Sequence, residues 1–393
     1  MKNCAKTATQ ESSAQKTLVR ENSGASKAQK TVFLGMSGGV DSSVSAILLK
    51  NAGYKVVGCY MKNWSKDLPG MKCPWAEDLA DAKRVATKLD LDFLIFDFEK
   101  AYKEKVVDYM IAEFKSGRTP NPDIMCNEEI KFKLFFEEAL ARGADFIATG
   151  HYAKSENGLL KLAKDENKDQ TYFLYRISKE ALKKTIFPLS DMKKPEVKAF
   201  AKENGLSNAY KKESMGVCFV GDVGMKDFLR EYIDIKPGEI REIETEKVLG
   251  THDGTVFYTL GQRHGLYVGG GLPYYVVKKD LEKNIVYVSN NLNEKNLWSK
   301  EIELENIFLR DAIEKTEQQG NNKKLDNNQE SKSTEQASSP IKIRIRHRAP
   351  LIPAIFIPSE SRVILQEEIK VPASGQSIVF YSGDVCLGGG IVK

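Results

Sequence analysis

Residues Ser37–Ser43 combine small, polar and acidic side chains at a spacing suited to holding a phosphate group. An apolar run, Val32–Leu34, precedes them, and an apolar helical pattern follows from Val44 to Leu49. Glycines let the backbone approach an anion closely, and the start of a helix offers unpaired N–H groups with a partial positive charge. The stretch therefore predicts a strand, a phosphate-binding loop and a helix. No Gly-Lys-Ser/Thr sequence ends the loop, which excludes the Walker type.

The spacing Ser-Gly-Gly-x-Asp-Ser resembles the PP-loop of ATP pyrophosphatases, which cleave ATP to AMP and pyrophosphate. This resemblance implies that ATP is the ligand of the loop at Ser37–Ser43. An ordinary capped helix after a glycine turn is the competing interpretation, and it would be preferred for a lone Gly-Gly pair. The full seven-residue string favours the nucleotide site.

A second stretch, Arg118–Asn127, carries two prolines, an aspartate and a cysteine. The prolines predict an extended, rigid loop. Cys126 is predicted to lie just ahead of a helix that begins near Glu128, where the helix N-terminus would lower the pKa of its thiol. Asp123 lies three residues earlier and could bond to a nearby donor or a substrate base. The alternative is a small buried cysteine in a rigid loop.

The six cysteines are scattered along the chain, and no two form a Cys-x-x-Cys pair. This pattern argues against a zinc ribbon and a secreted disulfide framework, so a reducing cytoplasm is the expected location. Cys218 has apolar neighbours and would pass as a core cysteine if taken alone. Cys59 and Cys386 follow strand patterns, and Cys73 is in a loop. No apolar run approaches the roughly 20 residues of a membrane helix.

Alternating strands and helices must position these residues. The alternation indicates an α/β fold with a doubly wound parallel sheet, in which ligands bind at the carboxyl ends of strands. Met36, Met61 and Gly150 lie at predicted strand ends and could therefore line one pocket. Strands are predicted at residues 32–34, 54–61, 92–96 and 145–151, the last of which runs into a loop. Helices are predicted at residues 44–49, 76–89, 101–116, 130–142 and 195–204.

Three domains and two disordered segments are predicted from pattern and composition. Residues 31–215 are the ATP-binding domain, residues 216–298 a small β-rich central domain, and residues 299–393 a β-barrel. Residues 1–30 and 314–339 are polar and cannot repay their ordering entropy, so both are predicted to be disordered. The β-like runs of the last two domains lie at residues 247–249, 255–258, 274–277, 285–288, 342–348 and 377–381.

Most of the net charge of +5 comes from residues 1–30, which hold six Lys and Arg against two Glu. The remaining chain is nearly neutral, so any RNA-binding surface must come from local clustering of basic side chains. One such cluster is Lys342, Arg344, Arg346 and Arg348, which would share one face of a strand and suit a phosphate backbone. A solvated strand face is the alternative interpretation.

Eight strings between Gly35 and Lys393 together resemble the MnmA family of tRNA-specific 2-thiouridylases. Their number and order make this resemblance much more specific than the PP-loop alone. Two positions depart from the family pattern, because His264 stands where Lys is common and Cys59 where an apolar residue would serve. The strings are GMSGGVDSSV, YMKNW, GRTPNPDIMCNEEIKF, ATGHYA, KDQTYFLY, GVCFVG, YTLGQRHGL and GQSIVFYSGDVCLGGGIVK.

The resemblance implies a reaction in which ATP adenylates the C2 oxygen of the wobble uridine. Cys218 would then carry a persulfide whose terminal sulfur attacks the activated carbon. Cys126 would act as the partner thiol, either as a base or by forming a transient disulfide with Cys218, and Asp123 would act as a base or orient the substrate. Mg²⁺ would neutralise the triphosphate. The implied ATP-binding residues are Gly35, Met36, Ser37, Gly38, Gly39, Val40, Asp41, Ser42, Met61 and Gly150.

The same resemblance implies that tRNA and a sulfur-relay protein are the partners. The tRNAs would be those for Lys, Glu and Gln, and the protein would act as a cytoplasmic monomer with no membrane contact. Asn121–Asp123 would touch the target base. The implied tRNA-binding residues are Asn121, Pro122, Asp123, His151, Lys168, Asp169, Gln170, Arg344, Ile345, Arg346 and Gln376.

Three alternatives stay open at this point. An amidating PP-loop enzyme would adenylate a small substrate and accept ammonia, but it would need neither two reactive cysteines nor a basic barrel. A tRNA-binding protein without catalysis is disfavoured by the intact loop and both cysteines. In the third alternative, Cys126, Cys218 and Asp123 hold an iron–sulfur cluster, because thiolates are its usual ligands.

Overall fold

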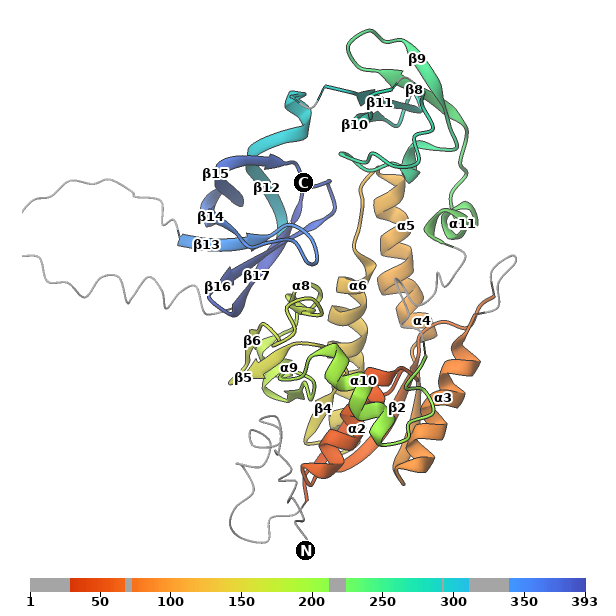
Figure 1. Ribbon diagram of the computed structural model, residues 1–393, viewed down its shortest axis with the longest axis vertical. Coiled ribbons are helices and arrows are strands. Elements are labelled where there is room, and N and C mark those ends of the chain that lie inside the picture. Colours follow the sequence, from red (N-terminus) through yellow and green to blue (C-terminus); the bar gives the residue numbers. More distant parts are fainter. Residues whose placement is uncertain (1–28, 68–72, 212–223, 270, 292, 311–338) are drawn as a thin grey trace, which may run out of the picture.

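The computed structural model describes residues 29–67, 73–211, 224–269, 271–291, 293–310 and 339–393. They form an α/β part, a small central β domain and a barrel, arranged as an elongated molecule (Figure 1). The predicted disordered tail and the predicted disordered insertion at 314–339 lie almost entirely outside the described residues. Cys218 lies outside them as well.

The α/β part contains a five-stranded parallel sheet with the strand order β3-β2-β1-β4-β7, which confirms the predicted fold class. The chain first forms β1, β2 and β3 in order toward one edge of the sheet. It then returns to the other side of β1, where β4 and β7 extend the sheet toward the opposite edge. A crevice for a ligand is expected where the strand order reverses in this way. The strands are β1 (Thr31–Gly35), β2 (Lys55–Lys62), β3 (Asp92–Asp97), β4 (Phe146–Ala148) and β7 (Thr185–Ile186).

Helices cover both faces of the sheet, and the alternation of side chains along β1 explains why. Val32 and Leu34 belong to a buried core that includes α2 (Val40–Asn51), α3 (Trp75–Lys88) and α10 (Lys194–Glu203). Phe33 points to the other face and joins a second core. That core includes residues from α4 (Glu99–Tyr102), α5 (Asp108–Lys115), α7 (Phe135–Ala141), α8 (Thr171–Leu174) and α9 (Lys179–Lys183).

The helix that carries Cys126 begins earlier than predicted. It starts as α6 (Pro122–Met125), continues as the π-helical η2 (Cys126–Leu134) and ends as α7. The prediction that Cys126 precedes a helix beginning near Glu128 was therefore wrong, because Pro122 occupies the first helical turn, where its missing N–H has no cost. A second π-helical segment, η1 (Lys103–Val107), joins α4 to α5.

The central domain is a four-stranded sheet with the order β10-β11-β8-β9 and its own small core. The predicted β-like run at residues 255–258 is wrong, because η3 (Thr255–Phe257) is a 3₁₀ turn that follows Gly254. The other elements are α11 (Met225–Arg230), β8 (Gly238–Glu242), β9 (Val248–His252), β10 (Tyr275–Asp280), β11 (Ile285–Ser289) and η4 (Lys295–Leu297).

The last part is a closed barrel, as predicted, in which six strands follow the order β12-β15-β14-β13-β16-β17 and β17 pairs back with β12. The hairpin β5 (Lys154–Glu156) and β6 (Leu159–Lys161) of the α/β part adds to this sheet through β17, so the two parts share a continuous sheet. The barrel elements are β12 (Trp298–Leu309), β13 (Ser339–Arg344), β14 (Ile352–Ile357), η5 (Pro358–Glu360), β15 (Arg362–Lys370), β16 (Ser377–Ser382) and β17 (Val385–Val392).

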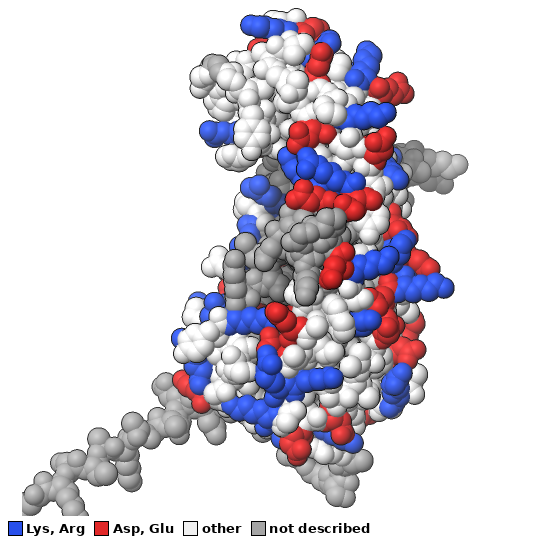
Figure 2. Space-filling view, turned by 90° about the vertical axis from the view of Figure 1, so that its right-hand side faces the viewer, with Lys and Arg blue, Asp and Glu red and all other residues white. Residues whose placement is uncertain are grey.

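The basic cluster of the barrel does not share one strand face. Strand β13 ends at Arg344, and the amide of Ala349 donates to the carbonyl of Arg346 in a turn. Arg348 has a positive φ of 63°. The predicted common face was therefore wrong, although Arg346 and Arg348 are exposed. Over the face drawn in Figure 2, acidic and basic side chains are interspersed, which agrees with the near-neutral charge of the chain beyond residue 30.

Candidate active site

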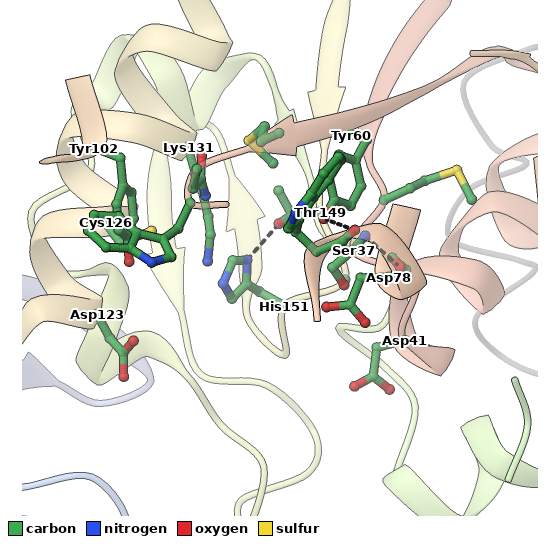
Figure 3. A pocket seen from close by; sticks show the side chains of 18 of the residues that line it. Ser37, Asp41, Tyr60, Asp78, Tyr102, Asp123, Cys126, Lys131, Thr149 and His151 are labelled. Atoms are coloured by element: carbon green, nitrogen blue, oxygen red, sulfur yellow. Dashed lines mark hydrogen bonds between the residues drawn. The ribbon is translucent and has the colours of Figure 1, made fainter. Parts of the chain in front are cut away.

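A cavity of about 330 Å³ lies at the carboxyl ends of β1, β2 and β4, where the strand order reverses. It brings together the glycine loop and the helix that carries Cys126, two stretches that are far apart in the sequence (Figure 3). The predicted site residues that line it are Gly35, Met36, Ser37, Asp41, Ser42, Met61, Asp123, Cys126, Gly150, His151 and Gln170.

The glycine loop is shaped by close backbone contacts. Gly38 has a φ of 77°, and a Cβ there would lie 2.4 Å from the carbonyl oxygen of Asp78 in α3. A Cβ on Gly150 would lie 2.8 Å from the amide nitrogen of Ser42. Both positions therefore require glycine, because larger residues would push the loop away from its neighbours. Helix α2 begins directly after the loop, with Gly39 as its N-cap.

Asp41 anchors a buried polar network beside this loop. The ammonium group of Lys194 lies 2.7 and 2.8 Å from the two carboxylate oxygens of Asp41, and the hydroxyl of Tyr152 donates to Oδ1 over 2.9 Å. The side chain amide of Asn208 donates to the carbonyl of Gly38 and to the hydroxyl of Ser43. Sequence reasoning missed Tyr152, Lys194 and Asn208. Tyr152 had a signal, because it follows His151 in the conspicuous ATGHYA string.

Asp123 and Cys126 occupy the other end of the cavity. They lie one helical turn apart, and Figure 3 shows both across the cavity from Ser37 and Asp41. Cys126 is buried, with an exposed fraction of 5%. Burial raises the pKa of Asp123, and the positive charge of Lys131 partly opposes this effect. A raised pKa makes a carboxylate a stronger base, which suits the role of a general base.

His151 lies between the two ends and is neutral at physiological pH. Burial, together with the nearby charge of Lys131, holds the pKa of His151 well below its usual range. Its Nδ1 lies 2.8 Å from the hydroxyl of Thr149, and its ring contacts that of Phe132. A neutral imidazole in this position can donate or accept a hydrogen bond without adding charge to the cavity.

Several of the predicted tRNA-binding residues have partners within the protein. Asp169 is 2% exposed and pairs with Arg344 of the barrel over 3.0 Å. Gln170 accepts a hydrogen bond from the amide of Tyr152. The Asp169–Arg344 pair connects the segment beside the cavity to the barrel, and the contact of these residues with tRNA stays a prediction. Lys168, Ile345 and Arg346 also stay predictions as tRNA contacts.

The loop Gly117–Asn121, which leads into the Cys126 helix, is held by all three parts of the molecule. Thr119 donates its amide to the carbonyl of Ser374 over 2.8 Å and accepts at its own carbonyl from the side chain of Gln376 over 2.7 Å. The hydroxyl of Thr119 also lies 3.2 Å from that of Thr259 in the central domain. Gln376, predicted to contact tRNA, thus fixes this loop, and the tRNA contact itself is untested.

Cys218, the predicted persulfide carrier, lies outside the described residues, so the structure does not test its approach to Cys126. Within the part of the chain that the structure describes, no group of three or more His, Cys, Asp or Glu side chains is arranged to hold a metal ion. The iron–sulfur alternative needs Cys218 and stays open. No helix among the described residues is long and apolar enough to cross a membrane.

Three family models match successive parts of the chain. The first, described as the HUP domain of a tRNA methyl transferase, matches residues 30–222. The second, described as its PRC-barrel domain, matches residues 226–290, and the third, an aminomethyltransferase beta-barrel domain, matches residues 323–392. The three matches follow the order of the α/β part, the central domain and the barrel.

Curated relatives extend this likeness to most of the chain. Proteins named tRNA-specific 2-thiouridylase MnmA from Bacillus licheniformis and Bacillus subtilis are each 43% identical to it, over 92% of this chain and 94% of theirs. Among solved structures, the NH3-dependent NAD synthetase from Campylobacter jejuni is 20% identical with a TM-score of 0.31, over 50% of this chain and 71% of its own. By its similarity to the Bacillus proteins, this chain belongs to the MnmA family of tRNA-specific 2-thiouridylases.

Proposed function

We propose that this protein is a tRNA-uridine 2-sulfurtransferase that uses ATP to replace the C2 oxygen of the wobble uridine with sulfur. The observation that carries the proposal is the cavity that holds a phosphate-binding loop at one end and Cys126 with Asp123 at the other. ATP activation and sulfur transfer need such groups within reach of one substrate atom. The 43% identity to proteins named tRNA-specific 2-thiouridylase supports the same activity.

The first step activates the base. The C2 oxygen of uridine attacks the α-phosphorus of ATP, and the bond to pyrophosphate breaks. The N–H groups at the start of α2 and the loop glycines would bind the phosphates. Asp41 and Asp78 line the cavity beside the loop and are paired with Lys194 and Lys211. Their carboxylates would be the groups to hold Mg²⁺, which would neutralise charge on the triphosphate.

The second step delivers sulfur. The terminal sulfur of a persulfide on Cys218 attacks C2 of the uridine, and AMP leaves with the former C2 oxygen. The Cys126 thiolate then attacks the sulfur of Cys218, forming a Cys126–Cys218 disulfide and releasing the 2-thiouridine. An external thiol must reduce that disulfide before the next cycle, and a sulfur-relay protein must reload Cys218. In the other route, Cys126 acts as a base.

Substrate binding would use the parts outside the cavity. Asn121–Asp123 would meet the target base, because Asp123 lines the cavity and Asn121 precedes the helix. Exposed basic side chains of the barrel, such as Lys342 and Arg346, would meet the phosphate backbone of tRNA. We further propose action on the tRNAs for Lys, Glu and Gln, in the cytoplasm and as a monomer.

A single-turnover assay tests the function. Enzyme loaded with labelled persulfide sulfur is mixed with ATP and unmodified tRNA, and AMP, pyrophosphate and 2-thiouridine are measured together. The expected result is one pyrophosphate and one AMP for each 2-thiouridine formed. Release of AMP with ammonia and without tRNA would instead support the amidating alternative.

The same preparation distinguishes the persulfide mechanism from one that uses an iron–sulfur cluster. Protein purified without oxygen is examined by visible absorption and assayed before and after iron removal by a chelator. The persulfide route predicts full activity after chelation, with the label on Cys218. Loss of activity on chelation, regained with iron and sulfide, would replace the persulfide with a cluster.

A further inference from the structure

We propose that Lys194 is a positioning residue of the ATP site, which holds the Asp41 carboxylate for the phosphate end of the nucleotide. This inference rests on the proposed use of ATP. Lys194 has no part in the sequence motif of the loop, from which it is separated by 153 positions in the chain. It does not line the cavity itself, whereas Asp41 does, so its effect on the nucleotide must pass through Asp41.

Lys194 contacts both oxygen atoms of the Asp41 carboxylate. The ammonium nitrogen of Lys194 contacts both carboxylate oxygens of Asp41, at 2.7 and 2.8 Å, and the Tyr152 hydroxyl donates to one of them. Lys194 is 6% exposed, so water competes little for its ammonium group. Charge-assisted hydrogen bonds of this kind fix the rotation of a carboxylate more firmly than a single neutral donor would.

The backbone of Lys194 is fixed as well. Its amide donates to Oδ2 of Asp165 over 2.8 Å, and the other oxygen of that carboxylate accepts the amides of Asn167 and Lys168. Helix α10, which starts at Lys194, packs against α2 through Val197 and Ala201 in the same buried core. The position of the ammonium group is therefore set by packing and does not depend on a flexible surface side chain.

The positive charge of Lys194 would also matter for the binding of ATP and the release of pyrophosphate. A carboxylate beside a triphosphate adds negative charge where the substrate already carries several, and the leaving pyrophosphate is an anion too. The ammonium group of Lys194, which contacts both carboxylate oxygens of Asp41, offsets that repulsion. Removing the cation would leave a partly exposed carboxylate that keeps the hydrogen bond from Tyr152 but has lost the positive charge that balances it. We therefore expect Lys194 to affect the binding of the magnesium–nucleotide complex more than the binding of tRNA.

Lys194→Met tests the inference, with pyrophosphate release measured against ATP at several Mg²⁺ concentrations. We expect the KM for ATP or the Mg²⁺ requirement to rise about 10- to 100-fold, because that is the effect of losing one charge-assisted hydrogen bond. Lys194→Arg should recover part of this loss. The matched control is Lys193→Met, which removes the exposed neighbouring ammonium and should leave both values unchanged.

A double-mutant cycle tests whether Lys194 acts through Asp41. Asp41→Asn combined with Lys194→Met should be no worse than Asp41→Asn alone, because the carboxylate that Lys194 holds is gone. Additive losses, or unchanged KM and Mg²⁺ dependence in Lys194→Met, would overturn the inference. If Lys194→Met fails to fold, Lys194→Gln removes the charge but keeps a polar side chain, and an unchanged KM and Mg²⁺ requirement there would also overturn it. Absence of pyrophosphate release from the wild type would refute the proposed function instead.

Discussion

The two ends of the cavity are held in place in different ways. At the glycine-loop end, every described support comes from the α/β part: Gly38 against Asp78, Gly150 against Ser42, and Asp41 against Lys194. At the thiol end, the loop Gly117–Asn121 that precedes the Cys126 helix is bonded to the central domain and the barrel. The nucleotide end is therefore local to one domain, while the thiol end depends on how three domains are arranged.

This difference suggests how tRNA binding and sulfur chemistry are linked. The barrel is the part proposed to meet the phosphate backbone of tRNA, and it contacts the loop that positions Asp123 and Cys126, as the central domain does. The barrel is also tied to the α/β part by the buried Arg310, whose guanidinium donates to the carbonyls of Tyr175, Ile177 and Cys386. A shift of the barrel would thus reach the thiol end before it reaches the phosphate loop.

The largest expected effects separate the two ends by their chemistry. Asp41→Ala should abolish pyrophosphate release and leave tRNA binding largely intact, because the loop faces ATP. Cys126→Ser should abolish formation of 2-thiouridine and still allow one round of pyrophosphate release. Pyrophosphate release and a tRNA binding isotherm, measured in parallel, check both variants. Normal pyrophosphate release from Asp41→Ala would contradict the assignment of the phosphate end.

Two other cysteines provide the control for this comparison. Cys59 and Cys386 are fully buried, and burial raises the pKa of each thiol, so neither supplies a thiolate at neutral pH. Cys59→Ser should keep the activity if the protein folds, and the same holds for Cys386→Ser. A loss of thiolation in either variant without a loss of melting temperature would show that a third thiol takes part.

A smaller effect is expected when the thiol end is displaced from outside the α/β part. Gly375 has a φ of 90°, and a Cβ there would lie 2.9–3.0 Å from backbone atoms of Thr119. Gly375→Ala should push the Gly117–Asn121 loop and lower the rate of thiolation about 10- to 100-fold, the loss expected from a misplacement near 1 Å. The affinity for ATP should not change, because the phosphate loop has no contact with this turn.

Gly383→Ala is the matched control for that experiment. Gly383 also has a positive φ, 59°, but no atom lies within 4 Å of its Cβ position. Alanine at position 383 would therefore strain the backbone in the same way, but it would not contact Thr119. Equal losses of thiolation in the two variants would show that strain in the barrel, and not contact with the loop, controls the thiol end.

The same comparison explains what could be predicted from the sequence. The phosphate loop was identified because its signal is contiguous, and a glycine string followed by a helix has few other uses. Lys194 was missed because its role depends on where α10 packs, and the Lys193–Lys194 pair looks like an ordinary solvated helix start. The start of the Cys126 helix was misplaced although Pro122 after Asn121 is a standard first-turn pattern.

Tertiary context also decided the strands that were wrong. Residues 255–258 are rich in β-branched and aromatic side chains, but residues 255–257 form a 3₁₀ turn in which the amide of Phe257 donates to the carbonyl of Gly254. The basic run after Ile343 stops as a strand at Arg344, whose side chain turns to the buried Asp169 of the α/β part. That partner is 175 positions away, and no local pattern could reveal it.

The smallest expected effect concerns stability at the thiol end and its dependence on pH. Lys279 of β10 donates its ammonium group to the carbonyl of Gly117 over 2.6 Å, and burial lowers the pKa of Lys279 to about 8. In the unfolded chain a lysine keeps a pKa of about 10.4. Between these values the unfolded state binds more protons than the folded state, so the free energy of unfolding rises with pH.

The variant Lys279→Met lacks this contribution. The stability of the wild type relative to Lys279→Met should therefore increase from pH 8 to pH 10, as measured by urea unfolding, with the exposed Lys278→Met as the control for loss of a lysine from the same strand. A relative stability that stays constant or falls over this range would show that the ammonium group of Lys279 is not buried against the loop.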